Sequence, residues 1–311
     1  MIGPQRPVMA IHGVHEIQYL EYQGKRIFLF SDATHGYTQC SDARYQPRIA
    51  VEKYLYQLSK RMEAALCIEG TVGKNIWLQQ PTSSHMENVN HLFHASRVNH
   101  FEVHAIDERF TDGKSLDGLV QGLMNQFPTH SGIQPLFDIA SMHDSSAYKR
   151  VMQPIVSYLM NKYKFNDRTV TDAVLDQNYQ DIALFYAQHK KVLHREQRDF
   201  EQEGRQIPPV LYEFMAAFFM FLVDLTLFIH LASSKPSTVF VYLGSQHIHN
   251  IVHAFNAMGI RTTQLSGPSD GCIAVDRVNA MLHVAFQGAR PLPRPRSKRG
   301  KKNKARKTCH K

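Results

Sequence analysis

The sequence predicts an α/β protein with a largely parallel central sheet, flanking helices and a long helical insertion. Three features indicate this: short apolar stretches that suit buried strands, helical patterns between them, and a long helical stretch in mid-chain. Strands that alternate with helices favour a parallel sheet with helices on its faces. The 311 residues, 43% of them hydrophobic, are enough to form a packed core.

The first expected strands form a hairpin over residues 15–31, with a turn at Gln23 and Gly24. Its second strand, residues 27–30, is apolar throughout, which is typical of a strand buried on both faces. After a loop, a helical pattern covers about residues 48–62. Further strands are expected at residues 64–68, 101–106, 238–243, 261–265 and 281–286.

The helical insertion is expected at about residues 115–232, inside a single α/β domain that covers residues 1–288. The pair Pro208 and Pro209 gives a start signal for its last helix. Another helix is expected after the 238–243 strand. The helical patterns cover roughly residues 115–126, 148–164, 169–203, 211–232 and 247–258.

Residues 214–232 are almost as long and apolar as a membrane-spanning helix, which needs about 20 residues. Asp224 lies near the middle of this segment, and a charge at that depth in lipid is costly. The sequence therefore predicts a buried core helix in which Asp224 has a hydrogen-bond partner, and no membrane contact. A membrane-anchored form is the alternative.

The basic residues of the chain are concentrated at its end. The formal net charge is +9, but residues 290–311 hold 11 Lys and Arg and no acidic residue. Without them, 36 − 11 = 25 basic residues face 27 acidic ones, a balance of −2. We expect residues 289–311 to be a disordered basic tail that binds nucleic acid or another anionic partner, or that serves as a nuclear address or aids solubility.

The four cysteines lie far apart and form no CxxC pair: Cys40, Cys67, Cys272 and Cys309. This spacing predicts neither a zinc finger nor a disulfide framework. The first residues lack the charged start and apolar stretch of a secretory signal. An intracellular location is expected, either cytoplasmic, nuclear or virion-associated.

Ionisable residues follow the major expected strands. The carboxyl ends of parallel strands share one edge of a sheet, and ligands bind there. Small neighbours, Gly36, Gly70 and Gly244, would allow a ligand to approach the backbone. Any one of these residues could instead be an ordinary surface group. The residues at these positions are Asp32, His35, Glu69, Asp107, Arg109 and His247, and the candidate site comprises the last five of them.

Two types of chemistry fit these residues. Histidines and a carboxylate can hold a divalent metal, Mn, Co or Zn, that activates water, with His35, Glu69 and His247 as ligands. Without a metal, a histidine oriented by a carboxylate can act as a base while Arg109 binds an oxyanion. The sequence has no GxGxxG motif and no P-loop, so no nucleotide cofactor is expected.

Four short motifs resemble a known superfamily. SDATHG at residues 31–36 resembles the GExTHG signature of erythromycin-esterase-like proteins, and GSQHIHNIVHAFNAMG at residues 244–259 resembles the GxxH element of TraB and TIKI proteins. Two further motifs are CIEG around Glu69 and IDER at residues 106–109. Together the four motifs place His, Glu, Asp with Arg, and His in the same order along the chain as in the erythromycin esterase, ChaN, TraB and TIKI superfamily, which they resemble. The layout is also similar to uncharacterised proteins of large DNA viruses.

The resemblance implies an α/β fold with a helical insertion and a metal-assisted hydrolase, an esterase or a peptidase, whose core is His35, Glu69 and His247. The chain departs from the superfamily at Ser31, where Gly is favoured, and at Asp32, where Glu is frequent. A shorter carboxylate at position 32 reaches less far, which puts catalysis in question. The alternative is a non-catalytic virion or scaffold protein that uses its basic tail.

Overall fold

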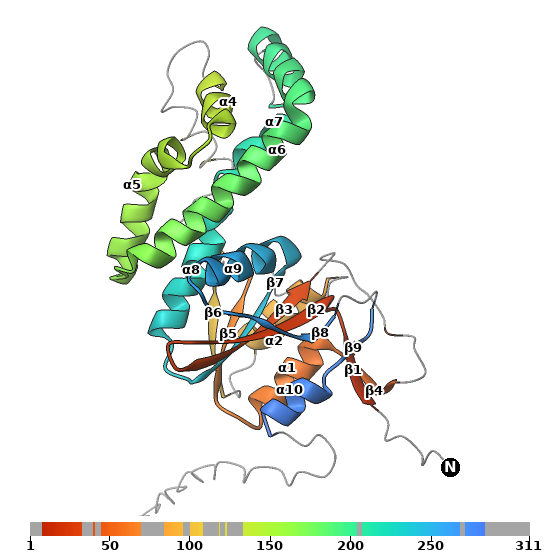
Figure 1. Ribbon diagram of the computed structural model, residues 1–311. Helices are drawn as coiled ribbons and strands as arrows, with labels where there is room; N and C mark the ends of the chain where they lie inside the picture. Colours follow the sequence, from red (N-terminus) through yellow and green to blue (C-terminus); the bar gives the residue numbers. More distant parts are fainter. Residues whose placement is uncertain are drawn as a thin grey trace, which may run out of the picture.

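The computed structural model describes residues 8–32, 40, 45–69, 84–95, 100–107, 118, 122, 133–203, 207–267 and 271–283. It confirms the predicted α/β class, because a mostly parallel six-stranded sheet is flanked by helices (Figure 1). The strand order is β6 (Phe101–Ala105), β5 (Ala64–Ile68), β7 (Thr238–Gly244), β3 (Lys25–Asp32), β2 (Glu16–Tyr22) and β8 (Thr263–Ser266).

The middle of this sheet is apolar on both faces. β6, β5, β7 and β3 run parallel to one another. At one edge, β2 pairs antiparallel with β3, and β8 pairs antiparallel with β2. All seven residues of β7 are buried. Phe240 and Tyr242 pack on one side of it, and Val239 and Val241 on the other. A continuous apolar run is therefore what this central parallel strand requires.

Each face of the sheet has its own helices (Figure 1). α1 (Val51–Ser59), α2 (His85–Ala95) and α10 (Asp276–Met281) pack on the face that carries Phe240. α8 (Phe221–Ser233) and α9 (Ser245–Ala257) pack on the opposite face. The two hydrophobic cores are thus separated by the sheet.

A helical arm extends from the α8 and α9 side (Figure 1). It consists of α4 (Gln134–Ser141), α5 (Ser146–Tyr163), α6 (Arg168–Glu203) and α7 (Pro209–Ala217), all between β6 and β7 in the chain. The helix expected at residues 211–232 is in fact two helices, because residues 218–220 form a turn between α7 and α8. Of the helix expected at 115–126, only residues 118 and 122 are described, and both are helical.

The apolar segment of α7 and α8 is a core element of the structure. Pro209–Ser233 is long and apolar enough to cross a membrane, with a mean hydropathy of 2.1, and 78% of its most apolar window is buried within the protein. Buried helices of soluble proteins pass the same test. Asp224 is 1% exposed and has hydrogen-bond partners, as predicted.

A second, smaller sheet was not expected from the sequence. β1 (Val8–His12) lies between β4 (Tyr45–Ala50), which is parallel to it, and β9 (Ile273–Ala274), which is antiparallel. The prediction of a strand at residues 281–286 is wrong at its first residue, because Met281 is the last residue of helix α10. Residues 284–286 lie outside the described part of the chain.

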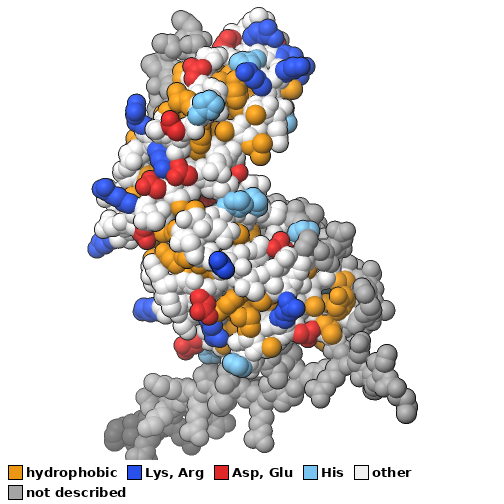
Figure 2. Space-filling view, in the orientation of Figure 1, with side chains coloured by type: hydrophobic (Ala, Val, Ile, Leu, Met, Phe, Trp, Pro, Cys, Tyr) orange, Lys and Arg blue, Asp and Glu red, His pale blue; other side chains and the backbone are white. Residues whose placement is uncertain are grey.

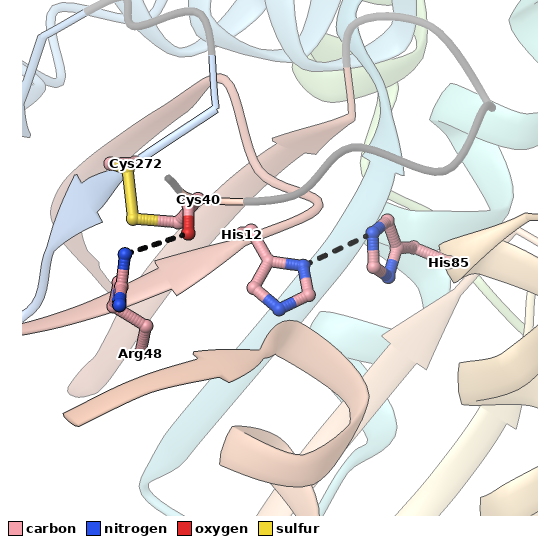
Figure 3. Close-up of a disulfide and its surroundings, with 5 residues drawn as sticks. All are labelled: His12, Cys40, Arg48, His85 and Cys272. Atoms are coloured by element: carbon pink, nitrogen blue, oxygen red, sulfur yellow. Dashed lines mark hydrogen bonds between the residues drawn. A yellow bond between two sulfur atoms is a disulfide. The ribbon is translucent and has the colours of Figure 1, made fainter. Parts of the chain in front are cut away.

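One disulfide joins two of the distant cysteines (Figure 3). Cys40 and Cys272 are 232 residues apart in sequence, yet their Cα atoms are 4.8 Å apart. The prediction of no disulfide framework was wrong, because folding brings together two cysteines that no local sequence pattern pairs. Cys67 is a free, buried thiol, and burial raises its pKa.

Charged side chains are mixed on the surface. On the face shown in Figure 2, acidic and basic side chains are interspersed over the arm and the sheet domain. This agrees with the near-neutral balance calculated for residues 1–289. The expected basic tail, residues 289–311, lies outside the described residues.

Candidate functional site

The candidate site lies at the carboxyl edge of the four parallel strands. Asp32 ends β3, Glu69 follows β5, and Asp107 follows β6. β7 ends at Gly244, immediately before α9, which carries His247. The sequence placed these residues at one edge because parallel strands present their carboxyl ends together.

Glu69 is tied to the start of α9. Its Oε2 accepts a hydrogen bond of 2.9 Å from the backbone N–H of Gly244, and its own N–H donates to Tyr242 O at 3.3 Å. Gly244 is the N-cap residue of α9. A carboxylate at this position is stabilised by the unpaired N–H groups and the positive end of the helix dipole.

His247 is held by a buried carboxylate from α8. Its Nδ1 lies 2.7 Å from Oδ1 of Asp224, and both side chains are almost fully buried. Nδ2 of Asn250 donates to Oδ2 of the same carboxylate at 3.3 Å. Because an ionised carboxylate only accepts, the proton of this contact belongs to Nδ1 of His247. In the neutral ring, Nε2 is then the basic nitrogen.

Nε2 of His247 faces Glu69. The distance from Nε2 to Oε1 of Glu69 is 3.6 Å, which is too long for a hydrogen bond. A lone pair on Nε2 and a carboxylate repel each other, so a proton or a cation shared between them would stabilise this arrangement. Two ligands of one tetrahedral zinc lie roughly 3.4 Å apart, so the spacing also suits a metal.

The opposite face of the same edge carries Asp32. The Tyr242 hydroxyl donates to Gly13 O at 2.9 Å and lies 3.3 Å from Asp32 Oδ2. Burial, followed by the charge of Asp32, raises the pKa of Tyr242 well above its usual value. The phenol therefore remains protonated and acts as a donor between the two sheets.

A buried histidine, His85, lies beside Gly13. Its ring faces that of His12 (Figure 3). Nδ1 of His85 donates to Glu52 Oε2 at 2.9 Å, and its Nε2 is 3.5 Å from Nδ1 of His12. His85 is fully buried at the start of α2, and its contact with Glu52 of α1 offsets the cost of burying the polar ring.

The structure brings together two of the five predicted site residues, Glu69 and His247. Asp107 is buried at the same edge, next to the strand that precedes Glu69. His35 and Arg109 lie outside the described residues. Sequence reasoning missed Asp224 as a member of the site, although a lone carboxylate within an apolar helix was the available signal.

In the described part of the chain, no group of three or more His, Cys, Asp or Glu side chains could hold a metal. The predicted ligand set includes His35, so this finding leaves that set untested. Comparison with protein-family models, curated proteins and solved structures gave no match. The superfamily resemblance thus remains a prediction that rests on the four motifs.

Proposed function

We propose that this protein is a hydrolase of ester or peptide bonds whose centre is the His247–Glu69 pair, in line with the resemblance to TraB, TIKI and erythromycin-esterase-like proteins. The observation that carries the proposal is the Asp224–His247 contact of 2.7 Å beside Glu69. A buried carboxylate that orients a histidine is a recurring device of hydrolytic sites, where it fixes the tautomer that acts as base or metal ligand.

Each residue of the centre has a defined task. Asp224 holds the His247 ring and stabilises its charged form when Nε2 takes a proton. Glu69, fixed by the Gly244 N–H, keeps a negative charge within 3.6 Å of Nε2. A Mn, Co or Zn ion bound by His247, Glu69 and His35 would lower the pKa of a water molecule and supply the nucleophile. Without it, Nε2 of His247 would accept the proton of the attacking water.

The test is a screen of the purified protein against ester and peptide substrates, together with its metal content. We expect His247→Ala to lower the hydrolytic rate by roughly 100-fold or more, since a positioned acid or base contributes at least that factor. His253→Ala is the matched control, because His253 is an exposed histidine on the same helix.

Stoichiometric metal that is lost in both His247→Ala and His35→Ala would support the metal-assisted form. Hydrolysis without bound metal would support the histidine-base form. Equal rates for His247→Ala and His253→Ala would refute a role for the His247–Glu69 pair in hydrolysis.

A second candidate function is non-catalytic, a virion or scaffold protein that binds nucleic acid or another anionic partner. The observation that favours it is the tail, with 11 Lys and Arg and no acidic residue in residues 290–311. The rest of the chain has a balance of −2, so binding to polyanions would depend on the tail. An intracellular location without a membrane suits either function.

Truncation after Gly288 tests the tail. We expect the full chain to bind DNA or RNA with little sequence preference and with an affinity that falls steeply with salt, because each phosphate contact releases counterions. The truncated chain should bind at least tenfold more weakly at about 0.15 M salt. Equal binding of both forms in a fluorescence-anisotropy titration would show that the tail is not the binding element.

A further inference from the structure

Residues of α6, of α9 and of the segment that joins α7 to α8 line a small pocket. These helices meet where the helical arm joins the sheet domain (Figure 1). The volume of the pocket is about 270 Å³. Its apolar lining residues include Leu184, Phe185 and Met220. Its polar lining residues carry carboxylate and amide groups from α6 and α9, including Asn178 and Asp181.

Asn178, one of the residues that line the pocket, has an unsatisfied acceptor. The residue is 1% exposed, and its Nδ2 donates to Tyr148 OH at 2.6 Å and to Ala217 O at 3.2 Å. The Ala217 carbonyl accepts only, which fixes Nδ2 on that side of the amide. Among the described residues, Oδ1 of Asn178 has no hydrogen-bond partner. A buried acceptor without a donor is costly, so a ligand that donates would be stabilised there.

Asp181 adds a negative charge to the lining of the pocket. Its carboxylate accepts from Gln177 Nε2 and from Gln246 Nε2, both at 3.3 Å, which are long contacts for a charged acceptor. None of the described residues that line the pocket is a Lys, Arg or His. Burial is the largest cause that raises the pKa of Asp181, and a cation placed beside it would oppose that shift.

We propose that this pocket binds a primary ammonium group on an alkyl chain, with Asn178 Oδ1 and the Asp181 carboxylate as acceptors. The ammonium group has three donors and no acceptor, which matches a lining that has amide oxygens, one carboxylate and no cationic side chain among the described residues. Its alkyl chain would lie along Leu184 and Met220, and the Phe185 ring can attract the cation through its π face. A free diamine and a lysine side chain share this chemistry.

The pocket is also connected to the candidate site. Asn250, which lines the pocket, accepts from Gln246 at 3.0 Å and donates to Asp224 at 3.3 Å, the carboxylate that holds His247. A ligand that draws Gln246 or Asn250 toward itself would alter that support. The binding proposal itself depends only on the pocket and is independent of any hydrolytic activity.

Cadaverine is the probe, titrated into the full-length protein by calorimetry or ligand-observed NMR, with 1-pentanol as an uncharged molecule of equal chain length. We expect saturable cadaverine binding and at least tenfold weaker binding of 1-pentanol. Asp181→Asn should weaken cadaverine at least tenfold. Asp199→Asn is the matched control, because it removes the same charge from an exposed position of the same helix and should leave binding unchanged.

A second variant tests the pocket without removing a partly buried group, in case Asp181→Asn alters folding. Leu184 is 57% exposed, so Leu184→Arg should fold normally while its guanidinium group blocks the pocket and lowers cadaverine affinity. A synthetic peptide of residues 290–311 tests whether the natural ligand is a lysine side chain of the tail. If the peptide competes with cadaverine, and Asp181→Asn abolishes this competition, the ammonium group belongs to a lysine of the tail. The proposal is overturned if cadaverine does not bind, if 1-pentanol binds equally well, or if Asp181→Asn and Asp199→Asn bind alike.

Discussion

Replacing Asp224 by alanine should lower the free energy of unfolding by about 3–5 kcal/mol, the loss typical when a buried carboxylate is removed from its hydrogen-bond partners. The carboxylate is 1% exposed and accepts from His247 Nδ1 at 2.7 Å and from Asn250 Nδ2 at 3.3 Å. Alanine would leave both donors buried and unpaired, next to a cavity in α8. Urea-induced unfolding followed by circular dichroism measures the loss.

Two comparisons show whether the loss comes from the hydrogen bonds. Asp224→Asn keeps an acceptor for one of the two donors, so we expect a smaller loss of about 1–3 kcal/mol. Asp199→Ala removes an exposed carboxylate of the helical arm and should change stability by less than about 0.5 kcal/mol. If Asp224→Ala were as stable as Asp199→Ala, the buried pair would not contribute to the folded state.

The second large effect is expected at Gly13, where alanine should cost about 2–5 kcal/mol. Its φ of +87° lies in the left-handed region, which costs a residue with a Cβ about 1–2 kcal/mol. A Cβ there would also lie 2.5 Å from Cγ of His85, and overpacking of this kind costs about 1–3 kcal/mol. The ring cannot easily move, because Glu52 holds its Nδ1 at 2.9 Å.

Gly24 provides the matched control for this substitution. Its φ is +74°, but a Cβ would meet nothing within 4 Å. Gly24→Ala therefore reports the conformational cost alone, about 1–2 kcal/mol. The difference between the two variants in thermal or urea unfolding isolates the clash with His85. Equal losses would mean that His85 does not pack against Gly13 as described.

The sequence predicted the larger sheet well because its signals are local. The hairpin, the helix after the loop and the strands β5, β6 and β7 each show a period or an apolar run that needs no knowledge of partners. β1 and β4 gave no such clear signal, because each is short and β4 contains Pro47, which is unfavourable within a strand. The stretch around residue 281 was misassigned because a short apolar run fits a helix as well as a strand.

By itself, the sequence determined the fold class and the edge at which Glu69 and His247 meet, since strand direction and helix alternation follow from local residue patterns. Only the tertiary structure decided which side chains pair there. Asp224 contacts His247 because α8 packs beside α9, Cys40 forms a disulfide with Cys272 although the two are 232 residues apart in sequence, and the His85 ring packs against Gly13. A local pattern encodes burial, whereas the choice of partner is made by packing between elements distant in sequence.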